Sequence, residues 1–289
     1  MFFETQLLAS DWLAQKKVQI WVMRIDKIHP QISGNKWFKL KYNLQEARTL
    51  GFDTLLTFGG AYSNHIYATA AAGKIFGFQT ISIIRGEKTL PLNETLTFAQ
   101  AQGMKLDYVS REQYRQKNEP YFIRQLQEKW GRFYLIPEGG SNALAVKGCA
   151  EILQNCPIDF DFICLPCGTG GTLAGVSLAL SPHQRALGFA VLKNAQFLYK
   201  EVVKLQQEAA QIHTQNYHIF LDYHLGGYAK IPLFLQSFCN LFTNTFSIPI
   251  EPIYTGKMFL GIWDLISKDF FAPYTQIVAL HTGGMRLSS

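Results

Sequence analysis

The sequence predicts an α/β protein with two domains, each built on a twisted, parallel-rich sheet covered by helices. Short apolar strands alternate with helix-length segments, which is the pattern of βαβ units and parallel sheets. The apolar runs are continuous rather than alternating, as expected when helices cover both faces of a sheet. The predicted strands are residues 18–25, 54–60, 79–86, 104–110, 133–140, 160–168, 186–191, 217–223 and 275–284.

Helical patterns fill most of the gaps between these strands. In "QISGNKWFKLKYNLQEARTLG", residues 31–51, apolar residues recur at helical spacing and Gly51 is a C-terminal stop signal. Ser33 or Asn35 is expected to cap the start of this helix. The other predicted helices are residues 64–77, 92–103, 111–130, 143–154, 171–180 and 193–212.

The order of these elements predicts where the two domains divide. Residues 49–141 hold four strand–helix units, which is enough for a small parallel sheet. Residues 1–48 and 142–289 would form the larger domain, with a sheet that combines N-terminal and C-terminal strands. The predicted boundaries lie in the connections on either side of the four units.

Composition and charge exclude several classes of protein. The chain is 48% hydrophobic and 17% charged, which is typical of a globular protein. Its net charge of +6 is spread along the chain without a basic run, so we expect no nucleic-acid partner. No apolar run is long enough to span a membrane, and Glu4 interrupts the N-terminal apolar stretch, so we expect neither a membrane segment nor a secretory signal.

The cysteine pattern indicates a reducing compartment and no metal site. The chain has five cysteines, and Cys164 and Cys167 form a C-x-x-C within and just after an apolar strand pattern. Because no second pair stands at zinc-like spacing, we expect two buried thiols rather than metal ligands. An odd number of cysteines without a secretory signal favours the cytoplasm.

Two lysines stand at an unfavourable end of the helix predicted over residues 31–51. Lys36 and Lys39 both lie near its N-terminus, where the helix dipole is positive and disfavours a cation. Two solvated surface lysines would be one explanation. The other is that the position lowers the pKa of a lysine that has to react as a neutral amine.

The loop after the strand at 54–60 carries hydroxyl, amide and imidazole groups together. Ser63 or Asn64 can cap the following helix, and His65 lies in its first turn. Capping alone would explain one polar residue but not three in succession after a glycine pair. Free N–H groups at a helix N-terminus bind carboxylates and phosphates, so this loop is a candidate binding site.

A glycine-rich loop joins the strand at 160–168 to the next helix. Strand, loop and helix in this order form a phosphate cradle, and Thr169 and Thr172 add hydroxyl donors to Gly168, Gly170 and Gly171. The loop lacks the third glycine of the dinucleotide fingerprint and the lysine of a P-loop. It therefore predicts a phosphate site of another kind.

Three further loops follow predicted strands or helices and carry polar residues with glycine. Thr282 opens "TGG" after the last strand, and "PEGGSN" ends the predicted small domain. Tyr228 and Tyr254 lie in "GGYAKIP" and "PIYTGKMFLG". Ligands of open α/β sheets bind at the carboxyl ends of the strands, so these loops are expected to meet at one cleft.

Taken together, these motifs resemble the pyridoxal-phosphate enzymes of the tryptophan-synthase-β fold type, fold type II. Within that group the chain is similar to the 1-aminocyclopropane-1-carboxylate deaminase and D-cysteine desulfhydrase family. The matching motifs occur in the family's order over nearly the whole chain: "SGNKWFKL", "FGGAYSNH", "PEGGSN", "CGTGGTLAG", "GGYAKIP", "PIYTGKMFLG" and "HTGG". The resemblance implies that the larger domain binds pyridoxal 5'-phosphate.

The resemblance gives a reason for the two misplaced lysines. It implies that Lys36, the lysine of the G-N-K motif, forms the Schiff base with the cofactor aldehyde. An amine must be neutral to attack an aldehyde, and both the helix N-terminus and the second cation at Lys39 oppose protonation of Lys36. Lys39 itself is implied to contact the cofactor phosphate.

The remaining roles also follow from the resemblance. Gly168, Thr169, Gly170, Gly171 and Thr172 are implied to hold the phosphate, and Asn64 to contact the phenolic oxygen. Ser63, Asn64 and His65 are implied to bind the substrate carboxylate. Tyr228 and Tyr254 match active-site tyrosines, so the catalytic candidates are Lys36, Ser63, Tyr228 and Tyr254. Lys36 or one of the hydroxyls would remove the α-proton.

Two positions depart from the family pattern. The deaminases carry Glu after the tyrosine of "P-x-Y-x-G-K", where this chain has Thr255. A threonine, Thr255 or Thr282, can hydrogen-bond the pyridine nitrogen but holds its proton less well, which favours expulsion of a thiolate over opening of a cyclopropane ring. The other departure is His65, where many members have Gln, so a substrate other than those of the two namesakes stays open.

We therefore expect a lyase that eliminates the β-substituent of a small amino acid and releases a keto acid and ammonia, as D-cysteine desulfhydrase does. A 1-aminocyclopropane-1-carboxylate deaminase is the alternative, and a non-catalytic pyridoxal-phosphate-binding protein is an alternative of another class. The resemblance also implies a homodimer. The residues leave the enantiomer of the substrate open.

Overall fold

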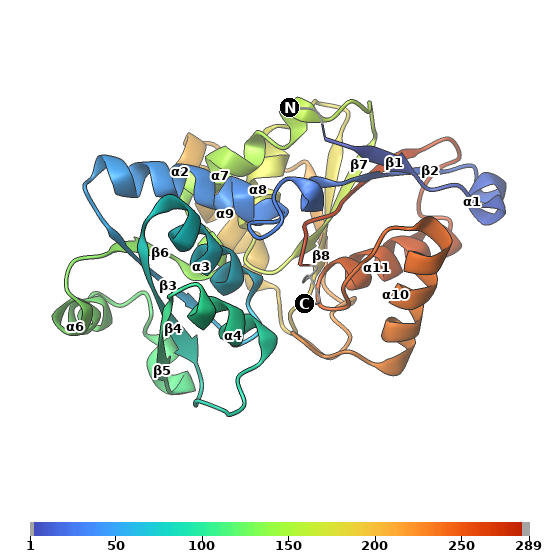
Figure 1. Cartoon of the computed structure of the whole chain (residues 1–289). Helices are drawn as coiled ribbons and strands as arrows, with labels where there is room; N and C mark the ends of the chain where they lie inside the picture. Colours follow the sequence, from blue (N-terminus) through green and yellow to red (C-terminus); the bar gives the residue numbers. More distant parts are fainter. Residues whose placement is uncertain (1–2, 285–289) are drawn as a thin grey trace.

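The computed structural model describes residues 3–284 and contains two sheets, each covered by helices (Figure 1). In the larger sheet the strand order is β1-β2-β10-β7-β8-β9, and all neighbours are parallel except β1 and β2. Its strands are β1 (Thr5–Leu7), β2 (Gln19–Met23), β7 (Phe162–Cys167), β8 (Arg185–Ala190), β9 (Tyr217–Phe220) and β10 (Gln276–Leu280). The predicted α/β class is confirmed, with N-terminal and C-terminal strands in one sheet.

The smaller sheet consists entirely of parallel neighbours in the order β5-β4-β3-β6. Its strands are β3 (Thr54–Gly59), β4 (Gln79–Arg85), β5 (Lys105–Val109) and β6 (Tyr134–Ile136). They correspond to the four strands predicted in this stretch. The division of the chain into domains at residues 49 and 141 stays a prediction.

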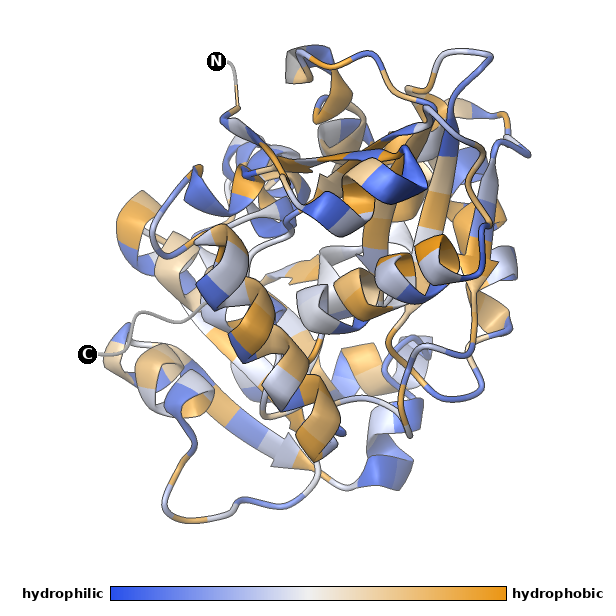
Figure 2. Cartoon of the chain, turned by 90° about the vertical axis from the view of Figure 1, so that its right-hand side faces the viewer, coloured by the Kyte–Doolittle hydropathy of each residue, from blue (hydrophilic) through white to orange (hydrophobic). Residues whose placement is uncertain are grey.

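Helices cover both faces of the larger sheet and bury its apolar side chains. On one face α7 (Ala143–Ala150), α8 (Gly171–Leu178) and α9 (Phe197–Ala210) pack on residues such as Ile163 and Val278. On the other face lie α1 (Asp11–Lys16), α10 (Leu233–Phe246) and α11 (Thr255–Ser267). The strands between these layers are among the hydrophobic segments in Figure 2.

The smaller sheet is covered by α2 (Asn35–Thr49), α3 (Asn64–Phe76) and α4 (Glu94–Ala101) on one side and by α5 (Arg111–Arg115) and α6 (Pro120–Trp130) on the other. All six residues of β3 are buried, which explains why its sequence, TLLTFG, is mostly apolar and has no charged residue. The helix predicted over 111–130 is two helices, because Pro120 begins α6 and cannot continue α5.

Several local predictions are corrected by the structure. Gly34, not Ser33 or Asn35, is the N-cap of α2, and no side chain caps this end. Gly51 follows the C-cap with a φ of +67°, as a C-terminal stop should. The strand predicted over 133–140 ends at Ile136, and short 3-10 helices occur at Ile25–Lys27, Glu138–Gly140 and Leu153–Asn155. Strand β1 and helices α1, α10 and α11 were not predicted.

The two remaining sequence inferences concern thiols and membranes. Cys164 and Cys167 are buried and free, as predicted from their strand position. Within residues 3–284, no three side chains of the metal-binding types gather at one place. None of the helices in that range has the length and apolar character needed to cross a membrane.

Candidate active site

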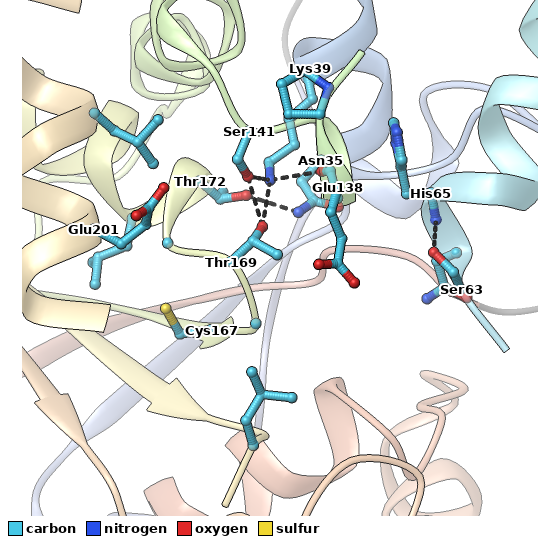
Figure 3. Close-up of a pocket in the computed structure, with 18 of the residues that line it drawn as sticks. Asn35, Lys39, Ser63, His65, Glu138, Ser141, Cys167, Thr169, Thr172 and Glu201 are labelled. Atoms are coloured by element: carbon cyan, nitrogen blue, oxygen red, sulfur yellow. Dashed lines mark hydrogen bonds between the residues drawn. The ribbon is translucent and has the colours of Figure 1, made fainter. Parts of the chain in front are cut away.

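One cavity of about 640 Å³ is lined by loops from both sheets (Figure 3). It lies at the carboxyl ends of β3, β4, β6, β7 and β10, where ligands of open α/β sheets bind. Most of the predicted site residues line it: Lys36, Lys39, Ser63, Asn64, His65, Gly168, Thr169, Gly170, Thr172, Tyr228, Tyr254 and Thr282. Residues that are far apart in the sequence therefore meet at one place.

Helix α2 presents both of its early lysines to this cavity. Lys36 Nζ donates to the Gly139 carbonyl at 3.2 Å. Lys39 Nζ, almost fully buried, donates to the same carbonyl at 3.0 Å and to the hydroxyls of Ser141 at 2.8 Å and Thr169 at 3.3 Å. Neither ammonium has a carboxylate within ion-pair distance in the described part of the chain.

This arrangement lowers the pKa of both lysines. Burial lowers the pKa of Lys36 well below its ordinary value of 10.5, and the charge of Lys39 lowers it further. Burial also lowers the pKa of Lys39. Lys36 is thereby favoured as a neutral amine, which can attack a carbonyl carbon or accept a proton. The buried Lys39, surrounded by neutral acceptors, also forms a site that an anion would stabilise.

The glycine-rich loop supplies the opposite side of this anion site. Helix α8 begins at Gly171 behind Gly170, which has a φ of +75° and provides no side-chain cap, so the first N–H groups of the helix stay available. A Cβ on Gly171 would lie 2.7 Å from Ser141 Oγ and 3.1 Å from Lys39 Nζ. Glycine at this position is therefore required for Lys39 to approach the loop, although Gly171 itself does not line the cavity.

The start of α3 forms the second polar wall. Ser63 is the N-cap, and its Oγ accepts from the backbone N–H groups of His65 at 3.2 Å and Ile66 at 3.4 Å. The hydroxyl proton of Ser63 is left to donate elsewhere. A carboxylate at this helix N-terminus would meet that proton and the favourable end of the helix dipole.

His65 presents an acceptor, not a donor, in this wall. Its Nε2 lies 2.8 Å from Thr57 Oγ1, and that hydroxyl donates its only proton to the Ile136 carbonyl at 2.8 Å. Nε2 must therefore carry the proton, and the buried Nδ1 keeps a lone pair with no partner among residues 3–284. Burial lowers the pKa of His65 well below its ordinary value, which keeps the ring neutral. Such a ring is poorly suited to bind a carboxylate.

The two predicted tyrosines contact each other. The ring centroids of Tyr228 and Tyr254 are 5.9 Å apart, and their hydroxyls are hydrogen-bonded. Tyr228 donates to the Tyr62 carbonyl at 3.1 Å, so the proton between the two tyrosines comes from Tyr254. Burial, and then Tyr228, raise the pKa of Tyr254 well above its ordinary value, so Tyr254 is a neutral proton donor at neutral pH.

Of the two threonines predicted to contact the pyridine nitrogen, Thr255 and Thr282, only Thr282 reaches the cavity. Thr282 lines it, but Thr255 is completely buried behind it and exchanges hydrogen bonds with Glu251. The prediction that Thr255 contacts a ligand is therefore corrected: its hydroxyl contacts Glu251 at the start of α11 instead. Glu251 accepts backbone N–H groups from Ile253, Tyr254 and Thr255 at the same helix end.

Several cavity residues were not predicted from the sequence. Asn35 Nδ2 donates to Thr172 Oγ1 at 2.8 Å and so joins α2 to the glycine-rich loop. Ser141 links Lys39 to Thr169, whose hydroxyl is 2.6 Å away. The "PEGGSN" motif that carries Ser141 was recognised, but no residue of it was assigned a contact. Arg85, Lys117 and Glu138 also line the cavity.

The fold and the cavity together define an α/β protein built to hold a phosphate-bearing carbonyl compound against a neutral lysine. The glycine-rich helix start and Lys39 fit a phosphate, because both offer donors and positive charge without a counter-ion. Lys36 fits the carbonyl, because its lowered pKa favours the neutral amine. The residues present therefore fit pyridoxal phosphate.

Comparison with known proteins gives the family. Residues 2–283 match the family described as "Pyridoxal-phosphate dependent enzyme". The chain is 31% identical to a putative 1-aminocyclopropane-1-carboxylate deaminase of Pyrococcus furiosus, over 92% of this chain and 84% of that one. It is 28% identical to a D-cysteine desulfhydrase of Salmonella typhi, over 95% and 88% of the two chains. The chain belongs to the family of pyridoxal-phosphate-dependent enzymes.

A solved structure supports the fold. The chain is similar to the crystal structure of an ACC deaminase homologue, with a TM-score of 0.88 and 27% identity over 99% of this chain and 90% of that chain. The implied tryptophan-synthase-β-like fold type II and the implied cofactor are thus confirmed.

Proposed function

We propose that this enzyme catalyses α,β-elimination on a small amino acid, as D-cysteine desulfhydrase does, and releases a keto acid and ammonia. The observation that carries the proposal is the position of Lys36, a lysine of lowered pKa between the phosphate cradle and the Ser63 helix start. Such a lysine can hold a carbonyl cofactor and exchange protons with a substrate bound beside it.

The proposal assigns the cofactor contacts to residues around the lysine. Thr169, Gly170, Thr172 and Lys39 would hold the phosphate, and Asn64 and Thr282 would flank the ring. When bound, pyridoxal phosphate supplies an electron sink that makes the α-proton of an amino acid acidic. The cavity supplies no threonine other than Thr282 near the end of β10, since Thr255 lies behind its wall.

We assign substrate binding and proton transfer to residues that line the cavity. Ser63 and Asn64 bind the substrate carboxylate, and the neutral ring of His65 lies buried beside them. Lys36 takes the α-proton. Tyr254, neutral and hydrogen-bonded to Tyr228, gives a proton to the departing β-substituent, while the bond from Cβ to that substituent breaks and water completes release of the keto acid and ammonia.

A deaminase acting on 1-aminocyclopropane-1-carboxylate is the second candidate, because the Pyrococcus furiosus relative bears that name. We favour the elimination because Thr282, the threonine at the end of β10 that lines the cavity, can hydrogen-bond the ring nitrogen but cannot hold its proton as a carboxylate would. We further propose that the enzyme is cytoplasmic and homodimeric. Exposed apolar side chains on α10, with Leu233 87% and Leu241 66% exposed, support a subunit contact.

The test is the visible absorption spectrum of the protein supplied with pyridoxal phosphate, compared with that of Lys36→Ala and Lys74→Ala. Lys74 is an exposed lysine outside the cavity. We expect a visible band in the native protein and in Lys74→Ala, and none in Lys36→Ala. If the native protein shows the band, ammonia release from D-cysteine and from 1-aminocyclopropane-1-carboxylate separates the two candidates. A native protein without the band would refute the assignment of Lys36.

A further inference from the structure

The wall of the cavity formed by the smaller sheet carries charged residues for which the proposed reaction has no use. Arg85 is the last residue of β4, and Lys117 follows α5. Glu138 lies on the 3-10 turn after β6, and Figure 3 shows it between the Lys39 cluster and Ser63. All three line the same cavity as Lys36 and Tyr254.

Glu138 is already held by neighbouring donors. Tyr114 Oη donates to its Oε1 at 2.8 Å, and Lys117 Nζ lies 3.5 Å from its Oε2. Both oxygens of this carboxylate thus have partners, and the charge of Glu138 is balanced by that of Lys117. Of the three charged residues in this wall, one positive charge therefore remains unbalanced and available to a ligand in the cavity.

The positive charge left over belongs to Arg85. Its guanidinium lies 5.7 Å from the centroid of the Tyr114 ring, and no carboxylate of residues 3–284 lies within ion-pair distance of it. Tyr114 also has Lys117 5.3 Å from its ring centroid, so the ring orients both cations along the cavity wall. A planar guanidinium with unused donors binds carboxylates or similar oxyanions in a bidentate manner.

The location of Arg85 puts its charge on the substrate side of the cavity. Its Nη2 lies 3.5 Å from where a Cβ of Gly60 would be, and the Gly60 carbonyl accepts from Ser63 N at 3.0 Å. The guanidinium is therefore close to the turn that leads to the Ser63 helix start. It lies on a different strand from the phosphate cradle, which follows β7 in the larger sheet.

We propose that Arg85 binds an anionic group at the outer end of the substrate's β-substituent. The preferred substrates would then be β-substituted alanines whose leaving group carries an acidic end, and not cysteine itself. This inference rests on the elimination proposed above and names its substrate class. A cavity of about 640 Å³ has room for such a substrate beside the cofactor.

The experiment compares two substrates of nearly equal shape with the cofactor-loaded enzyme. S-carboxymethylcysteine ends in a carboxylate, and S-carbamoylmethylcysteine ends in the neutral amide. Both enantiomers of each are assayed by release of keto acid. We expect kcat/KM to be roughly 10- to 100-fold higher for the acid, the range given by a charge-assisted hydrogen bond. In Arg85→Gln this ratio should fall towards one.

The matched control is Arg124→Gln, which removes an exposed arginine of α6 that does not line the cavity. This variant should keep the native ratio. A second readout needs no turnover: calorimetric binding of glutarate and of its monoamide, glutaramate. Glutarate should bind more tightly to the native enzyme, and Arg85→Gln should remove the difference.

The outcomes separate this inference from the proposed reaction. If D-cysteine releases keto acid but the acid and the amide react equally well, or neither reacts, the inference is wrong and the elimination stands. If Arg85→Gln lowers kcat/KM equally for the acid and the amide, Arg85 binds the α-carboxylate instead, and the inference is also wrong. If the native protein supplied with pyridoxal phosphate shows no visible band and releases keto acid from none of these substrates, the proposed function itself is refuted.

Discussion

The ammonium of Lys39 lies 2.8 Å from the hydroxyl of Ser141 and is surrounded by neutral acceptors only. A buried cation without a counter-ion destabilises a protein unless a ligand completes the site. The Lys39–Ser141 pair therefore connects the stability of the chain to occupancy of the phosphate cradle. Removing the charge of Lys39 should therefore weaken cofactor binding without lowering the stability of the cofactor-free protein.

Lys39→Met should weaken binding of pyridoxal phosphate by roughly 10- to 100-fold, since it removes a charged donor to the phosphate. The cofactor-free variant should be at least as stable as the native protein, because an unpaired buried charge is gone. Spectroscopic titration and urea unfolding measure the two effects. Ser141→Ala, which keeps the charge, should weaken binding less. Unchanged cofactor affinity in Lys39→Met would contradict the assignment.

Gly34→Ala should destabilise the protein by about 3–5 kcal/mol, near the upper end for single substitutions. A Cβ at Gly34 would lie 1.9 Å from the Thr282 carbonyl oxygen, and its φ is +64°. Gly77→Ala is the control, because Gly77 has a φ of +74° with open space around it, and should cost only about 1–2 kcal/mol. The midpoints of urea unfolding give the comparison. If Gly34→Ala and Gly77→Ala lower the free energy of unfolding equally, the contact between residues 34 and 282 is not tight.

Lys257→Met should reduce kcat about tenfold while the visible band of the bound cofactor persists. Lys257 is completely buried, and its Nζ donates to the Gly227 carbonyl at 2.7 Å, directly before Tyr228. The lysine thus positions the loop of an active-site tyrosine without contacting the ligand. Steady-state kinetics with the control Lys268→Met, an exposed lysine at the C-cap of the same helix, test this. A rise in KM with kcat unchanged would indicate a different role.

The native protein should lose stability as the pH rises from about 5 to about 7, and Glu251→Gln should abolish this pH dependence. Burial raises the pKa of Glu251 to about 7, so in this window the folded chain holds a proton that the unfolded chain has released. The native free energy of unfolding therefore falls as pH rises through the window. Urea unfolding of both proteins at pH 5, 6 and 7.5 measures the difference. Parallel curves would show that Glu251 does not titrate there.

The fold was largely predictable because its signals are local. Strands buried on both faces, such as β3, give mostly apolar runs without charged residues, and caps such as Ser63 mark where helices begin. Helices α10 and α11 were missed because aromatic and glycine residues within them obscure the helical pattern. Strand β1 has only three paired residues, and its place is set by β2, not by its own sequence.

The site was predictable where a motif carries the chemistry, and less so where contacts cross between elements. Lys36, Ser63 and Thr169 come from recognisable motifs, and the structure brings them into one cavity. Thr255 was misplaced because a step of one residue at a helix start turns the side chain away: Tyr254 faces the cavity and Thr255 faces Glu251.

Arg85 and Glu138 could not be paired from the sequence. Arg85 ends β4 and Glu138 lies in the 3-10 turn after β6, and β3 lies between these two strands. Only the strand order makes them neighbours in one wall. A motif search therefore finds the residues that would handle the cofactor more readily than those that would select the substrate.

The position of β10 between β2 and β7 has a consequence for synthesis of the chain on the ribosome. The smaller sheet uses only residues 54–136 and can assemble while later residues are still being added. The larger sheet joins Gln276 to Gln19, so its middle strand arrives last and must insert between neighbours made long before. Long-range pairing of this kind is slow and leaves strand edges exposed. The larger sheet therefore stays incomplete until β10 has been made, and the cavity that Thr282 lines forms only after that strand has inserted.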